Sequence, residues 1–177
     1  MTADSWRPRL RVTVLAGRGG KPIDGHRPVP GTKGGQVLTR RLACGAEITL
    51  ENVSCWLHGC SVPRVMGQEF GGMVETTGPG AIALTPDDRD TASFSFTCDH
   101  CEWCGTGRES RCGHFAGSSE AATAGASPKY GLVPSHNLVQ APDGLSPASQ
   151  GSLRIPSKPR TTQFEKARGL LLESGLR

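Results

Sequence analysis

The feature that most constrains this chain is a cluster of four cysteines with the spacing C-x2-C-x2-C-x7-C, in the stretch TCDHCEWCGTGRESRC. Thiolates are soft anionic ligands that suit Zn²⁺, and four of them complete a tetrahedral shell with no open position. Two-residue gaps let a tight turn aim successive sulfurs at one point, and Gly105 and Gly107 let the chain bend back. The sequence therefore predicts a structural zinc site, in a lobe of about residues 97–113, with the ligands Cys98, Cys101, Cys104 and Cys112.

Two other uses of these thiols stay open at this point. Iron–sulfur proteins also use C-x2-C-x2-C, but the bacterial ferredoxin pattern continues with C-x3-C-P, whereas Cys112 comes later here and is followed by Gly113. Disulfides are the other alternative, and they are rare in the reducing cytoplasm. Because four cysteines already complete the shell, we expect His100 and His114 to be exposed rather than bound to the metal.

Composition predicts a mainly β protein without a nucleic-acid or membrane partner. The 177 residues include 24 glycines and 13 prolines, which favours turns and short strands over a helix bundle. The net charge of +4 is scattered, whereas a nucleic-acid surface would show a basic stripe with aromatic residues. No apolar run approaches the roughly 20 residues of a membrane span, and arginines interrupt the apolar part of the N-terminus. We therefore expect a cytoplasmic location.

Alternating apolar residues and turn residues between them predict a series of short strands. Residues 17–35 and the low-complexity stretch from Gly117 are predicted to be loops. From Thr162 to Glu165 a capping box predicts the start of a short C-terminal helix. The fold class expected is a mainly β barrel with a zinc lobe. The predicted strands are residues 10–16, 36–43, 70–76, 91–96, 130–133 and 137–139.

Several further motifs lie in the same order as in a known family. VMGQEFGGMVETTGPG at residues 65–80 is similar to V-x-G-H-E-x-x-G-x-V-x-x-x-G-P-G, TPDDR at residues 85–89 to x-P-G-D-R, and VPSHNLVQAPDGLSP at residues 133–147 to a typical return segment. With the cysteine spacing, this set resembles the N-terminal GroES-like catalytic domain of zinc-dependent medium-chain alcohol dehydrogenases. The resemblance covers residues 9–148, which implies a GroES-like barrel there, with a linker and terminal helix over 149–177.

The resemblance also implies a second, catalytic zinc site that this chain matches only in part. Cys44, in the stretch CGAE, matches the first ligand, and Glu69 matches the glutamate of G-H-E. Gln68 stands where the family has histidine, and Ala46 where it has a hydroxyl that relays the alcohol proton. Cys44 and Glu69 are thus the candidate catalytic residues, and a second zinc is doubtful.

Three further residues in CWLHGC have ligand chemistry but no fourth partner that the sequence identifies, so we interpret them as loop residues: Cys55, His58 and Cys60. His26 and His136 are expected to face solvent. Asp90 stands where a barrel strand needs an apolar residue, which costs stability unless the charge is exposed or paired.

In the complete enzymes of this family a second, Rossmann domain binds NAD(P). GRGGKP at residues 17–22 lacks the dinucleotide-binding spacing, and about 30 residues after Pro147 are too few for such a domain. We therefore expect no Rossmann domain and no NAD(P) binding by this chain alone. The prediction is an alcohol dehydrogenase-like zinc protein, truncated before its nucleotide-binding domain and inactive alone. The alternatives are a stand-alone non-catalytic zinc-binding module, or one half of a split dehydrogenase. The possible partners are a separate chain with a Rossmann domain or further copies of this chain in a homo-oligomer.

Overall fold

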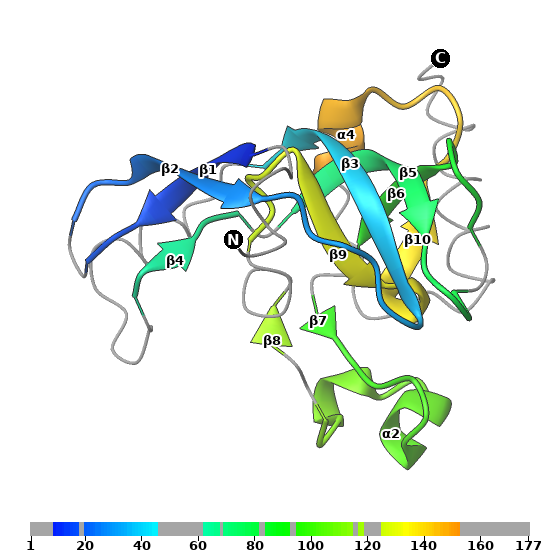
Figure 1. Cartoon of the computed structure of the whole chain (residues 1–177). Coiled ribbons are helices and arrows are strands. Elements are labelled where there is room, and N and C mark those ends of the chain that lie inside the picture. The colour runs from blue at the N-terminus through cyan, green and yellow to red at the C-terminus, as the bar shows by residue number, and fades with distance from the viewer. Residues whose placement is uncertain are drawn as a thin grey trace.

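The chain forms a mainly β structure, as the sequence predicts (Figure 1). It is a computed structural model that describes residues 9–17, 20–45, 62–67, 69–81, 84–92, 95–114, 117–118 and 125–152. All strand pairs in the described residues are antiparallel. Such a sheet can be built from short turns, which fits the glycine and proline content of the chain.

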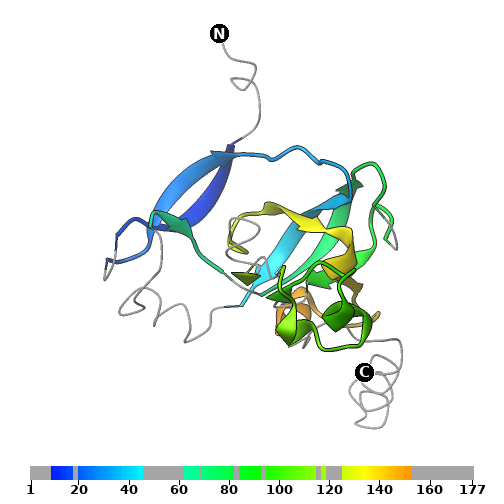
Figure 2. The ribbon, with the colours of Figure 1, turned by 90° about the horizontal axis from the view of Figure 1, so that it is seen from below.

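The largest sheet has five strands in the order β10-β6-β5-β3-β9. Its strands are β3 (Gln36–Cys44), β5 (Phe70–Thr77), β6 (Arg89–Ala92), β9 (Tyr130–Pro134) and β10 (Leu138–Gln140). A second sheet, in the order β2-β1-β4, contains β1 (Arg9–Leu15), β2 (Ile23–Pro28) and β4 (Arg64–Val65). In Figure 2 the blue strands of this sheet lie to one side of β3 and α4.

The remaining elements are short. A two-stranded ladder consists of β7 (Ser95–Phe96) and β8 (Gly117–Ser118), and the described helices are α2 (Glu102–Gly105), η1 (Glu109–Arg111), η2 (Ser135–Asn137) and α4 (Pro147–Gly151). Figure 1 shows that the segment with α2 projects from the barrel beyond β7 and β8. The ladder therefore stands at the base of the cysteine lobe.

The strand predictions agree with the structure except at four places. Strand β4 lies in a stretch for which no strand was predicted. The predicted loop at residues 17–35 contains β2, which pairs with β1 from Arg9 opposite Pro28 to Val14 opposite Ile23. All of β2 except half-buried Gly25 is exposed, so it has no apolar alternation for sequence reasoning to detect. The predicted strand at 91–96 is divided between β6 and β7, and β8 lies where a loop was predicted. The predicted terminal helix lies outside the described residues.

The main core lies against the five-stranded sheet. Alternate residues of β5, Phe70 and Val74, are buried there, and Val37 enters from β3. The full cluster is Val37, Phe70, Val74, Leu84, Phe96, Ala126, Val133 and Leu138. Phe96, with 1% of its surface exposed, lies two residues before the first cysteine of the lobe and so fixes its entry to the barrel.

Helix α4 closes one side of this sheet and crosses residue 148, the predicted end of the barrel. Ser146 caps its N-terminus by accepting a hydrogen bond from the Ser149 amide at 3.1 Å. A Cβ on Gly71 of β5 would lie only 2.6 Å from the Cβ of Gln150, so glycine is required for this close approach. When the side-chain amide of Gln150 is oriented so that its oxygen faces donors, this oxygen accepts hydrogen bonds from the Arg89 guanidinium, with Nη2 at 2.8 Å. The helix is thus held on β5 and β6.

Candidate metal centre

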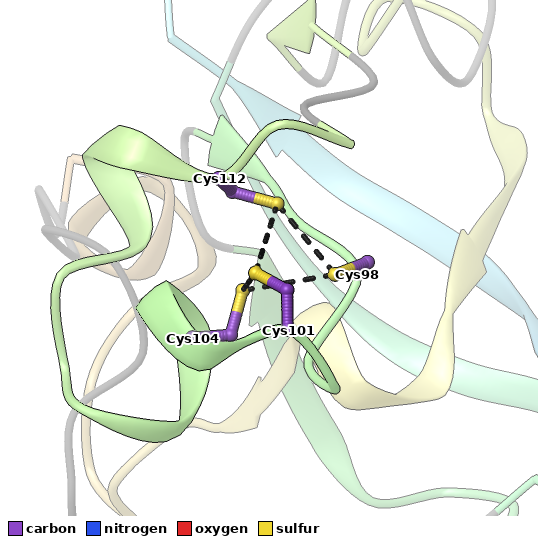
Figure 3. Close-up of side chains that lie close together, drawn as sticks. All are labelled: Cys98, Cys101, Cys104 and Cys112. Atoms are coloured by element: carbon purple, nitrogen blue, oxygen red, sulfur yellow. Dashed lines mark hydrogen bonds between the residues drawn. The ribbon is translucent and has the colours of Figure 1, made fainter.

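The four clustered cysteines come from one compact lobe whose local turns aim their sulfurs inward (Figure 3). Cys98 follows β7, and Cys101 precedes α2 at its N-cap position. Cys104 lies within α2, and Cys112 directly follows η1. The chain reverses between the two helices at Gly107, whose φ of 73° is readily adopted only by glycine. The sequence prediction that these glycine-containing turns bring back the fourth cysteine is confirmed.

The sulfur positions fit one tetrahedrally coordinated ion. All four lie within 4.8 Å of one another. Four pairs are separated by 3.5 Å (Cys101–Cys104), 3.6 Å (Cys98–Cys112), 3.9 Å (Cys98–Cys104) and 3.9 Å (Cys101–Cys112). Zinc–sulfur bonds of ~2.3 Å in a regular tetrahedron place sulfurs about 3.8 Å apart. A disulfide would bring two sulfurs to ~2.05 Å, so the thiols are not bridged.

The thiols of the cluster differ in acidity. Burial raises the pKa of Cys98, but amide hydrogen bonds from His100 and Cys101 outweigh it, so that this pKa lies below its ordinary value. Burial and hydrogen bonds to Cys101 and Cys112 raise the pKa of Cys104. Zinc binds thiolates, so zinc binding at this cluster would release protons.

Two arginines gather around the tryptophan of the lobe. The guanidinium carbons of Arg108 and Arg111 lie 5.4 and 5.3 Å from the ring centre of Trp103, within cation–π distance. Both arginines are exposed. A tetrathiolate zinc site would have a net charge of −2, and these two cations of the same lobe would oppose that charge.

The histidines near the cluster differ from the prediction in one case. His100 and His114 are exposed, as expected, and their rings stack with centroids 5.8 Å apart. His26 is also exposed. His136 was expected to face solvent, but it is half-buried, and its Nε2 lies 2.8 Å from the carbonyl oxygen of Thr97. Its serine-rich sequence context gave no sign of this contact, which forms only when η2 folds beside the entry to the lobe.

Among the described residues, the second candidate site has two members, Cys44 and Glu69. The pairing of β3 with β5 places Cys44 opposite Phe70, and the Gly45 amide donates to the Glu69 carbonyl at 3.0 Å, so Cys44 and Glu69 lie close together. Cys44 is exposed. Desolvation by the surrounding protein raises the pKa of its thiol, Arg41 acts in the opposite direction, and Glu69 adds to the rise. A raised pKa disfavours the thiolate that a metal needs.

Among the described residues, no third histidine, cysteine or acidic side chain joins Cys44 and Glu69 in a group that could hold a metal. The other residues that the sequence analysis named for the catalytic site, Ala46 and Gln68, lie outside the described residues, as do Cys55, His58 and Cys60 of the CWLHGC stretch. The described residues therefore fit the structural zinc but do not make up a second zinc site.

A buried charged pair near Cys44 was only partly expected from the sequence. Asp90 is fully buried, and neither of its carboxylate oxygens has a hydrogen-bond partner. Burial raises the pKa of Asp90 to about 7, and the Arg41 charge partly opposes this rise. Arg41 is buried as well, donates to the Gly125 carbonyl and lies over the Phe70 ring at 4.7 Å. Electrostatic attraction to Arg41 thus offsets only part of the expected cost of a charge inside the barrel, and no hydrogen bond offsets the rest.

Comparison with known proteins shows where this architecture belongs. The profile of the "Alcohol dehydrogenase GroES-like domain" family matches residues 33–143. The chain is a member of that family. The matched residues include the cysteine lobe and all five strands of the largest sheet, so the GroES-like fold predicted from the motifs is confirmed.

The matches to individual relatives cover only part of the length of those proteins. An L-threonine 3-dehydrogenase of Anaeromyxobacter sp. (strain K) is 30% identical over 109 residues, which are 61% of this chain and 31% of that protein. That of Bacillus velezensis is 31% identical over 127 residues, 68% of this chain and 36% of that protein. The chain thus spans about a third of the length of the curated relatives it matches.

Solved structures give the same fold. The crystal structure of AibC has a TM-score of 0.74 at 26% identity, covering 82% of this chain and 42% of that one. A cobalt- and zinc-bound thermostable alcohol dehydrogenase from Pyrobaculum aerophilum also has a TM-score of 0.74, at 24% identity, covering 84% of this chain and 45% of that one. None of the described helices of this family member is long and apolar enough to cross a membrane.

Proposed function

We propose that this family member is a zinc-stabilised, alcohol dehydrogenase-like module whose single metal ion is structural. The observation that carries the proposal is the sulfur geometry, in which four thiols lie within 4.8 Å of one another. Zinc in such a shell has no open position for a substrate oxygen. The ion would stabilise the fold of the cysteine lobe, whose described residues have little apolar core of their own.

We further propose that the 177 residues alone do not oxidise alcohols. Hydride transfer needs NAD(P) beside a polarised substrate, and the sequence has no dinucleotide fingerprint. Polarisation by zinc needs an open, incomplete shell, to which Cys44 and Glu69 contribute only two groups. Gln68 replaces an imidazole with a neutral amide, which is a weaker zinc ligand, and Ala46 offers no hydroxyl to relay a proton.

A second candidate function is half of a split dehydrogenase. The observation in its favour is that Cys44 and Glu69 lie together at the exposed end of β3, where a partner could add further groups. In this case a separate chain with a Rossmann domain would supply the nucleotide. The relatives are named L-threonine 3-dehydrogenases, so a small hydroxyl-bearing substrate would be tested first.

Two measurements on the purified chain test these proposals. Metal analysis should return one zinc per chain, and an NAD(P)-linked assay with simple alcohols and L-threonine should give no turnover. Hydride transfer by the isolated chain would refute the non-catalytic proposal. A second equivalent of zinc that disappears in Cys44→Ser would show that the catalytic-type site binds metal. Activity that appears only after a Rossmann-domain chain is added would support the split enzyme.

A further inference from the structure

The first cysteine of the metal centre lies between two peptide groups that are both held by histidines. His136 Nε2 lies 2.8 Å from the Thr97 carbonyl oxygen, which belongs to the peptide group before Cys98. His100 Nδ1 lies 2.7 Å from the Cys98 carbonyl oxygen, which belongs to the peptide group after it. The two peptide planes that flank a Cα atom determine its φ and ψ, and with them the direction of its Cβ.

Carbonyl oxygens only accept hydrogen bonds, so both rings must donate. His136 therefore has its proton on Nε2, and His100 has a proton on Nδ1. When the rings are neutral, these are two different tautomers. In each ring the position of the proton is set by the carbonyl oxygen that accepts the hydrogen bond.

The barrel side of this arrangement is firmly held. The neighbours of His136 in η2, Ser135 and Asn137, are each 5% exposed, and the Ser135 amide donates to the Gly35 carbonyl at 2.9 Å. Thr97 is 8% exposed and follows the core residue Phe96. The hydrogen bond from His136 thus joins two fixed parts of the barrel at the point where the chain enters the lobe.

We propose that His136 and His100 are positioning residues for the metal centre: they fix the peptide groups on both sides of Cys98 and so orient its sulfur toward the other three. The inference rests on the proposed structural zinc. His136 has the larger effect, because its bond is partly buried and joins the lobe to the barrel, whereas His100 is exposed and belongs to the lobe itself.

The test is the rate at which a chromophoric chelator removes zinc from the purified full chain. Loss of one partly buried hydrogen bond should accelerate release from His136→Ala roughly five- to tenfold, and from His100→Ala roughly twofold. His136→Gln places an amide donor near the position of Nε2 and should restore most of the wild-type rate. His26→Ala, an exposed histidine on β2, is the matched control and should release zinc at the wild-type rate.

The proposal would be overturned if the His136→Ala variant released zinc at the wild-type rate. It would also be overturned if His136→Gln and His136→Ala released zinc equally fast, since the packing of the ring would then matter rather than the hydrogen bond. If His136→Ala does not fold, long-range ¹H–¹⁵N spectra of the zinc-loaded wild type decide. A protonated Nε2 on His136 and Nδ1 on His100 support the proposal, and the opposite tautomers refute it. A purified chain with no zinc would instead refute the proposed function itself.

Discussion

Replacing Asp90 by asparagine should remove a pH-dependent loss of stability from this domain. The carboxylate is fully buried in β6, without a hydrogen-bond partner for either oxygen. Burial raises its pKa from 3.8 to about 7, against the opposing charge of Arg41. Asparagine keeps the shape of the side chain but cannot ionise, so the comparison isolates the charge.

The direction of the effect follows from proton binding. Below about pH 4 both the folded and the unfolded protein hold the Asp90 proton. Between about pH 4 and 7 the unfolded chain ionises while the folded protein keeps the proton, so stability falls as the pH rises. Above about pH 7 both forms ionise and the full penalty remains. The shift from 3.8 to about 7 corresponds to a penalty of about 4 kcal/mol.

Urea unfolding followed by far-UV circular dichroism, at pH values from 5.5 to 8, measures this contribution. Over that range the stability of Asp90→Asn relative to the wild type should rise by about 2 kcal/mol. The zinc site is common to both proteins, so its own pH dependence cancels in the difference. Asp143→Asn, at an exposed aspartate, is the control and should show no such trend. A difference between Asp90→Asn and the wild type that stays constant with pH, or falls as the pH rises, would refute the reasoning.

Three further changes test other parts of the structure. Cys101→Ala removes one of four zinc ligands, so we expect loss of the metal and a melting temperature lower by roughly 5 to 10 °C in calorimetry; unchanged zinc content and melting would contradict this. Gly131→Ala places a methyl group against the buried Arg41 guanidinium, with Nη1 only 2.7 Å away, and should cost roughly 1–3 kcal/mol in urea unfolding, while Gly17→Ala, in open space, should cost little. Cys44→Ser should leave the zinc content at one per chain in metal analysis, since the described residues around it do not complete a second site.

The parts of the fold with strong local patterns could be predicted from the sequence. The cysteine spacing predicted the lobe and the clustering of its four thiols, because closely spaced cysteines are brought together by local turns. Strands β3 and β5 followed from runs of strand-forming residues between turn residues. Strand β2 could not be recognised, because an edge strand that is exposed nearly throughout has no alternation, and its pairing with β1 is its main source of order.

The contacts that depend on tertiary packing were beyond the sequence. His136 lies in a polar stretch, and only the folded position of η2 brings its ring to Thr97. Asp90 was recognised as a misplaced charge, but its electrostatic attraction to Arg41 arises because β3 and β6 both pair with β5. The adjacency of Cys44 and Glu69 was implied only by the family resemblance.

The most direct test of the account is X-ray absorption at the zinc edge of the purified chain. We predict one zinc population with four sulfur ligands at about 2.3 Å and no nitrogen or oxygen in the first shell. Nitrogen or oxygen ligands, fewer than four sulfurs, or iron in place of zinc would contradict the account.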